Sequence, residues 1–281
     1  MPTASSAQAA RQGLADRLRE IRVAAGVTGV QLAAAAGWHR TKVSKLEHGV
    51  TAPSADDIRA WCRACGADGE AEELVAALVA SDSMWTEWRR MERAGLRQAQ
   101  ESVVPLWERT RRFRIYSSWL IPGPVQAEPY IRALLDATRA RRGLADDVEE
   151  ATAVRVAKQD VIHRPGQRFA ILLEEAALRY RIGGRDVLRA QLEHLLAVMD
   201  LPAVSLGVIP LDADRVTLRP VEMFFMFDDE LVAAEFVSGA LNVTAPAEVR
   251  QYGEAFEMLA SMAVYGDRAR ALIGEALVAL A

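Results

Sequence analysis

One stretch decides the fold of the N-terminal part of the chain: Arg40-Thr41-Lys42-Val43-Ser44-Lys45-Leu46-Glu47-His48-Gly49. It predicts a helix from about His39 to Glu47, which stops at His48-Gly49 because glycine takes the left-handed conformation that closes helices. On a helical wheel Val43 and Leu46 share one face, with Glu47 at its border. The opposite face is hydrophilic and is made by Thr41, Ser44, Lys45 and His48, with Arg40 and Lys42 beside them.

Such a division between two faces is what reading a DNA groove requires. The inner face anchors the helix to its neighbours, while the outer face offers donors to base edges and phosphates. From composition alone, an ordinary solvated surface helix is an equally good interpretation. The candidate DNA-binding residues are Arg40, Thr41, Lys42, Ser44, Lys45 and His48.

The rest of residues 1–80 has the pattern of further short helices. Apolar positions recur at helical spacing, and glycine or a capping residue marks the expected ends. The expected helices are a first with apolar residues 14–23, a second with 32–36, a fourth that opens at Ser54 and a fifth from about Glu70 towards Trp88. Five short helices in about 80 residues predict a compact all-α domain.

Four segments around the opening stretch keep a regular spacing: Arg22-Val23-Ala24-Ala25-Gly26-Val27-Thr28, Gln31-Leu32-Ala33, Gly37-Trp38-His39-Arg40 and Val43-Ser44-Lys45-Leu46-Glu47-His48-Gly49. Together they closely resemble the xenobiotic-response-element (Cro/repressor-type) family of helix-turn-helix regulators. The resemblance implies that the helix from Arg40 is the recognition helix. Its base- and phosphate-contacting positions are then Arg40, Thr41, Ser44 and Lys45.

Three residues depart from that family pattern. Gly29 stands where the family often has a glutamine that contacts DNA, His39 replaces the usual Ser or Thr cap, and Trp38 replaces a smaller aliphatic residue. The wheel and the resemblance also predict a structural ion pair between Arg22 and Glu47, since a charge at the inward border of a helix needs a partner.

Residues 81–281 are expected to form a second domain of a different class. Residues 81–115, rich in Trp and Arg, are read as a helical connector, and helices are expected at about 128–142, 146–162, 185–199, 247–264 and 267–280. Strands are expected at 169–173, 204–209, 221–227 and 231–237, the last two joined as a hairpin through Asp228-Asp229-Glu230. The chain is therefore predicted to be α+β and predominantly helical, with helices around a small, partly antiparallel sheet in the second domain.

Several segments of the second domain follow one another in a specific order: Pro122-Gly123-Pro124-Val125-Gln126, Tyr130-Ile131-Arg132-Ala133-Leu134, Arg155-Val156-Ala157-Lys158-Gln159, Glu174-Glu175-Ala176-Ala177-Leu178-Arg179 and Gln191-Leu192. They resemble an actinomycete-type, antitoxin-like domain that follows this kind of helix-turn-helix in many regulators. The resemblance implies a small companion protein bound by the second domain. Pro124-Val125 stands where that family usually has two leucines.

The charge of the chain is unevenly distributed. The whole chain carries −4, but residues 1–66 hold nine Lys or Arg against five Asp or Glu, so this part is +4 and the remainder is −8. A basic N-terminal part suits a polyanionic partner. No signal peptide or membrane span is recognised, and two cysteines are too few for an extracellular disulfide framework. We expect a reduced, cytoplasmic protein.

No catalytic or metal site is predicted, and no cofactor. Cys62 and Cys65 have the spacing of a redox or zinc pair, but no second pair exists, and inside a helix beside Trp61 they are expected to be buried small residues. The four histidines have no metal-binding spacing. A catalytic dyad remains open at this point.

Two hypotheses follow. The first is a homodimeric transcriptional regulator that binds double-stranded DNA and whose second domain binds a companion protein or an effector, without enzymatic activity. The alternative is a small-molecule sensor or enzyme with an accessory DNA-binding head. A deep cavity with convergent polar groups would favour the alternative, whereas a flat or grooved apolar patch would favour the first.

Overall fold

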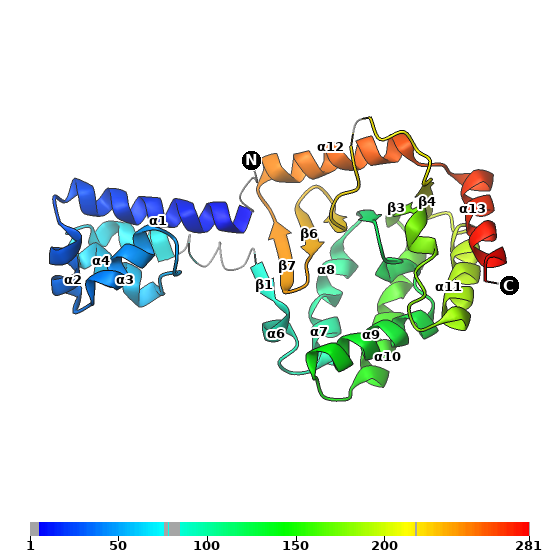
Figure 1. Ribbon diagram of the computed structural model, residues 1–281, viewed down its shortest axis with the longest axis horizontal. Coiled ribbons are helices and arrows are strands. Elements are labelled where there is room, and N and C mark those ends of the chain that lie inside the picture. Colours follow the sequence, from blue (N-terminus) through cyan, green and yellow to red (C-terminus); the bar gives the residue numbers. More distant parts are fainter. Residues whose placement is uncertain (1–5, 76–77, 79–84, 217, 281) are drawn as a thin grey trace. The chain divides into compact units, whose positions relative to one another are not determined.

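The computed structural model describes residues 6–75, 78, 85–216 and 218–280. The chain divides into two compact units, Met1–Thr86 and Glu87–Ala281. The first unit is built of helices and the second of helices around a sheet, so the predicted α+β, mostly helical fold class is confirmed (Figure 1). Within the described residues, no helix is both long and apolar enough to cross a bilayer.

The first unit consists of short helices that pack on one another. They are α1 (Ser6–Ala24), α2 (Gly29–Ala36), α3 (Arg40–Glu47), α4 (Ala55–Ala64) and the 3-10 turn η1 (Asp68–Glu70), followed by helical residues 71–75 and 78. The predicted fifth helix thus starts where expected, but its middle lies outside the described residues. Its expected end near Trp88 is wrong, because residues 85–87 are extended.

The core of the first unit is organised around Trp61 on α4. Its ring is fully buried, and its indole Nε1 donates to the carbonyl oxygen of Leu18 at 2.9 Å, which joins α4 to α1. The apolar stripes expected from the sequence supply the surrounding side chains, including Leu14, Leu18, Ile21, Leu32, Val43, Leu46 and Ile58. Val43 and Leu46 of α3 belong to this shared core, and α3 packs chiefly on α2 and α1.

The second unit begins with short elements and continues into a larger α+β body. The elements at its start are β1 (Trp85–Glu87, at the boundary between the units), α6 (Trp88–Met91), α7 (Leu96–Ser102) and α8 (Val104–Arg109). The body contains β2 (Arg112–Ser117), η2 (Gly123–Val125), α9 (Glu128–Arg142), α10 (Val148–Gln159), η3 (Asp160–His163), β3 (Arg168–Glu174), η4 (Glu175–Leu178), α11 (Arg185–Val198), β4 (Val204–Ile209), β5 (Phe224–Phe227), β6 (Leu231–Glu235), β7 (Gly239–Val243), α12 (Pro246–Met262) and α13 (Gly266–Val278).

The sheet of the second unit runs in the order β7-β6-β5-β2-β3-β4. Strands β2, β3 and β4 are parallel to one another, and helices connect them, as parallel strands require. Strands β5, β6 and β7 add to β2 in antiparallel fashion. The hairpin predicted at 228–230 is confirmed, and Asp228 takes a positive φ of 52° in its turn.

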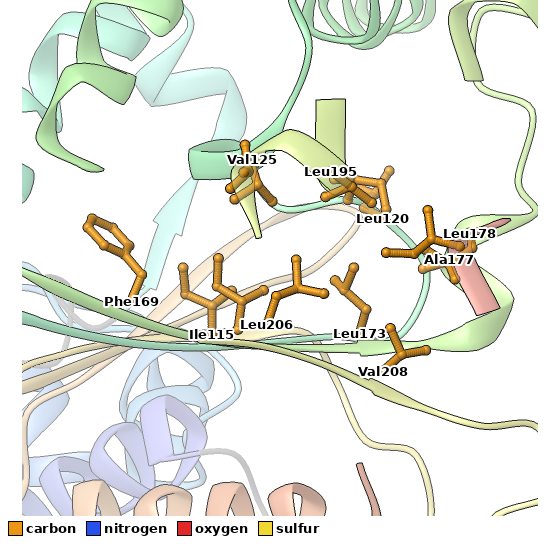
Figure 2. Packing of buried hydrophobic residues seen from close by; sticks show 14 of the residues in the cluster. Ile115, Leu120, Val125, Phe169, Leu173, Ala177, Leu178, Leu195, Leu206 and Val208 are labelled. Atoms are coloured by element: carbon orange, nitrogen blue, oxygen red, sulfur yellow. The ribbon is translucent and has the colours of Figure 1, made fainter. Parts of the chain in front are cut away.

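Both faces of this sheet are covered. On one face, alternate residues of the strands point at η2, α11 and α13, and Figure 2 shows Phe169, Ile115, Leu206 and Leu173 rising towards Val125 and Leu195. On the other face lies α12, whose Tyr252 ring stands 5.1 Å from the ring of Phe224. Burial on both faces explains why the strands are almost continuously apolar.

Three predictions about the second unit were wrong in detail. The segment 81–115 is not a continuous helical connector, because β1 lies within it and β2 starts at Arg112. The expected strand 221–227 begins only at Phe224, and strand β7 was not predicted. The charges of Arg112 and Arg114 hid the alternation of β2. Both arginines pair with Asp229 in the β5–β6 turn, a contact between residues far apart in sequence.

Candidate nucleic-acid interface

The connection between α2 and α3 is built by local sequence signals. Thr28 caps α2 in a reciprocal arrangement, because its Oγ1 accepts from the backbone N–H of Gln31 while the side chain of Gln31 accepts from the backbone N–H of Thr28. Gly37 ends α2 with a left-handed φ of 69°. The turn therefore needs few tertiary contacts to form.

His39 replaces the usual hydroxyl cap of α3 by an imidazole. Its Nδ1 lies 3.3 Å from the backbone nitrogen of Thr41 and 2.8 Å from Thr41 Oγ1, so a neutral ring with its proton on Nε2 accepts from both. This satisfies one of the free N–H groups at the start of the helix. The departure from the family pattern thus preserves the cap.

The inner border of α3 holds an ion pair. Arg22 Nε donates to Glu47 Oε1, and Arg22 Nη1 donates to the carbonyl oxygen of Val27 at 2.8 Å. Their side chains are 15% and 10% exposed, so removal of either partner would leave a largely buried charge without its counter-ion. The residues expected from the sequence to pair do so, and they fix the angle between α1 and α3.

The outer face of α3 presents donors to solvent. Arg40, Thr41, Ser44 and Lys45 are exposed, while Val43 on the inner face is buried. Within the part of the chain that the structure describes, neither Arg40 nor Lys45 forms an ion pair or a side-chain hydrogen bond. Their charges are therefore available to an external anion.

An open depression of about 420 Å³ lies between this face and the start of α2. Its lining includes Arg40, Thr41 and Ser44 from α3, together with Thr28, Gly29 and Val30. Gly29 has no side chain, so it leaves the depression open above Val43. Val30 was not among the predicted residues, although it is 68% exposed. The sequence could have indicated Val30, because it is a β-branched apolar residue on the outer face of a short helix, and apolar side chains contact the methyl group of thymine.

Two of the candidate residues are engaged within the unit. Lys42 Nζ donates to Asp57 Oδ1 at 2.6 Å and stands 4.4 Å from the ring centre of Trp38. Burial alone would raise the pKa of Asp57, but hydrogen bonds from Lys42 and Ser54 outweigh it and lower that pKa. His48 Nδ1 lies 2.7 Å from the carbonyl oxygen of Ser44 and closes the helix. Both side chains stabilise the fold of α3 in this arrangement.

The cysteines lie away from this face. Cys62 is fully buried in the core and Cys65 is partly buried, and both are free thiols. Burial raises the pKa of each, so little reactive thiolate forms at neutral pH. Their environment is that of packing residues.

Comparison with known families agrees with this division of the chain. A family model described as a helix-turn-helix domain matches residues 14–75, and a model described as "Domain of unknown function (DUF5753)" matches residues 100–275. The first unit thus contains a helix-turn-helix domain. Because the second match spans more than half of the chain, the protein belongs to the family defined by this domain of unknown function.

No protein of the curated set matches the chain. Among solved structures, a chain described as "Structure of TrmBL2, an archaeal chromatin protein, shows a novel mode of DNA binding" is similar at 11% sequence identity. The similarity covers 85% of this chain and 88% of the other, with a TM-score of 0.32.

Proposed function

We propose that the protein is a transcriptional regulator that binds specific sequences of double-stranded DNA through the outer face of α3. One observation supports this above all. Arg40 and Lys45, which have no ion-pair partner among the described residues, stand on the exposed face of a helix whose inner face is held by Val43, Leu46 and the Arg22–Glu47 pair. Arg40 and Thr41, at the N-terminal end of the helix, would enter the major groove first.

The contacts divide into two kinds. Arginine and lysine donate to O6 and N7 of guanine or to phosphate oxygens, and hydroxyl groups such as those of Thr41 and Ser44 donate to either. The N-terminus of α2 beside the depression supplies backbone N–H groups that favour a phosphate. A two-fold dimer would read two half-sites about one helical turn apart, so we expect an imperfect palindrome as operator and propose that the protein is a homodimer.

For the second unit we propose a binding role without catalysis, in which occupancy by a small companion protein or an effector changes the affinity for the operator. The resemblance to antitoxin-like domains supports the companion protein. The alternative, a small-molecule sensor, is favoured by a specific group of enclosed charges on α10 and β6 of the second unit.

The first experiment is a footprint and a mobility-shift titration on the DNA upstream of the protein's own gene. The full chain should protect a short palindromic segment. The Arg40→Ala, Lys45→Ala double variant should lose that protection, since each base-reading contact is worth about 1–3 kcal/mol.

A matched control removes two charges elsewhere on the same unit. Arg19 and Arg63 are both exposed, and neither lines the depression. The Arg19→Ala, Arg63→Ala variant has the same net charge as the test variant and should keep most of the affinity. Equal losses in the two variants would mean that the basic unit attracts DNA without using α3, and would contradict the proposal.

A further inference from the structure

Helix α10 of the second unit carries two cations for which no counter-ion in contact is found in the described part of the chain. Arg155 and Lys158 lie one turn apart on the helix, and both are partly buried. Across from them stands Glu235 at the end of β6. Among the described residues, none of these three forms an ion pair within 4.0 Å. Yet they are close enough that each alters the pKa of another.

The guanidinium of Arg155 lies beside Gly123 and Trp107. A Cβ at Gly123 would stand 3.5 Å from Arg155 Nη2 and 3.9 Å from the Trp107 ring, both ordinary contact distances, so Gly123 adjoins both side chains. The loop that contains Gly123 is held in turn by Gln159, whose Nε2 donates to the carbonyl oxygens of Gly123 and Gln126 at 2.6 and 2.8 Å. Within the described part of the chain, the guanidinium beside this turn forms no side-chain hydrogen bond or ion pair.

The ammonium group of Lys158 lies over the ring of Trp107. Its Nζ stands 4.7 Å from the ring centre of Trp107, a buried residue of the sheet core, and 3.4 Å from Gln100 Oε1. These neutral contacts do not balance its charge. Burial, and then the nearby Arg155, lower the pKa of Lys158 to about 7.

Glu235, the last residue of β6, is the acidic side chain whose charge acts on both cations. Its side chain is exposed to solvent, yet protein surrounds it closely enough that burial raises its pKa in spite of the attraction of Arg155, Lys158 and Arg142. The carboxylate thus lies close enough to both cations for its charge to act on them, without a direct ion pair.

Other buried charges of the same unit have direct partners. Glu174 is buried and receives direct hydrogen bonds from Arg215 and from Tyr116, and Glu92 is buried and pairs with Arg142. Direct pairing is the ordinary way to offset the cost of burying a charge. Among the described residues, Arg155 and Lys158 have no such direct ion pair, so an external anion could supply the missing counter-charge.

We infer that Arg155 and Lys158 form the binding site for the oxyanion of a small-molecule effector, a carboxylate or a phosphate. Trp107 lies beside both cations, and Glu235 lies near them. Arginine and lysine are the side chains that recognise these groups, and bonds between ionised partners are about twice as strong as neutral ones. As an effector site this inference rests on the proposed regulator. Binding of the anion itself involves the second unit alone.

The test is isothermal titration calorimetry on the full chain, without DNA, with inorganic phosphate and with benzoate as separate probes. At least one probe should bind with a dissociation constant in the millimolar range or tighter, and the better probe identifies the class of oxyanion. The Arg155→Gln, Lys158→Met variant should bind it at least about tenfold more weakly. A control variant, Arg250→Gln with Arg268→Gln, removes two exposed cations from α12 and α13 and should bind like the wild type.

A third variant probes the site without removing its donors. Glu235→Gln removes a carboxylate whose negative charge acts on both cations, so it should tighten phosphate or benzoate binding several-fold. This variant provides the test if the double variant does not fold. Lack of binding of both probes by the wild type at about 10 mM would overturn the inference. So would equal affinities of the double variant and the control, or weaker binding by Glu235→Gln. Because DNA is absent, these outcomes are independent of the footprint.

Discussion

Two pairs of cations, one in each unit, stand in opposite environments. Arg40 and Lys45 on α3 are exposed, whereas Arg155 and Lys158 on α10 are partly buried and have no counter-ion in contact among the residues that the structure describes. Exposed charges interact weakly with any one partner and are screened by salt, but many of them together attract a polyanion. Enclosed charges are costly to keep and little screened, so they suit one small anion. Under the two proposals, the same residue types would serve two kinds of recognition, and the degree of desolvation would separate them.

The largest expected effect concerns salt. Binding of operator DNA should weaken steeply between 50 and 200 mM salt, and the Arg40→Ala, Lys45→Ala variant should bind about 10²- to 10⁴-fold more weakly, with a salt slope lower by about one for each phosphate that the variant no longer touches. Binding of phosphate or benzoate at Arg155 and Lys158 should change much less over that range. Mobility-shift and calorimetric titrations at four salt concentrations measure both. Parallel salt dependences would abolish the distinction between the two pairs.

The second prediction is that Lys158→Met stabilises the protein. Folding lowers the pKa of Lys158 from 10.5 to about 7, so below pH 7 the ammonium is charged in both states and its enclosure costs stability in full. Between pH 7 and 10.5 the unfolded chain binds the extra proton, so this cost declines as pH rises. We expect a gain of roughly 1–3 kcal/mol at pH 6 that shrinks by pH 9, measured by urea denaturation.

The groups that face Lys158 are Arg155 on its own helix, Gln100 on α7 and Glu235 on β6. A control, Arg250→Met, places the same side chain at an exposed site of α12 and should leave stability unchanged at both pH values. An equal gain from Lys158→Met at pH 6 and pH 9 would point to packing on Trp107 as the cause, and the charge argument would fail.

The third prediction concerns the imidazole cap that positions the exposed pair. His39→Ala should destabilise the first unit by about 1 kcal/mol, because the backbone N–H of Thr41 loses its acceptor. His39→Ser should restore most of that loss, since a hydroxyl cap accepts the same bond. Thermal denaturation followed by circular dichroism compares the two. If the alanine and serine variants unfold at the same temperature, the cap has no energetic role.

The smallest effect is expected at Lys42, which the sequence placed among the DNA-binding residues. Its bond to Asp57 joins a side chain that is 42% exposed to one that is 17% exposed, so Lys42→Met should cost less than about 1 kcal/mol. The salt slope of DNA binding should stay as in the wild type. A slope lower by about one would instead show that Lys42 leaves Asp57 and contacts a phosphate.

The first unit could be predicted closely because its signals are local. Caps at Thr28 and Ser54, the left-handed Gly37 and the apolar face of α3 all lie within a few residues of the structure that they specify. The second unit was predicted in outline, with α9 and β4 placed at the residues expected. Strand β2 was missed because its arginines are neutralised by Asp229, more than a hundred residues away in sequence.

The sequence by itself indicated the two-part organisation and the pairing of Arg22 with Glu47. The assignment of α3 as a recognition helix came from a family resemblance, because its residues alone fit a solvated surface helix equally well. It placed both Lys42 and Lys45 among the candidate DNA-binding residues, and it assigned no role to Arg155, Lys158 or Glu235. Only the tertiary structure decided which of these cations are paired and which are partly buried without a counter-ion among the described residues. A cation's role depends on whether a carboxylate lies within reach and on how much protein excludes water from it. Both depend on residues that meet only when the chain is folded.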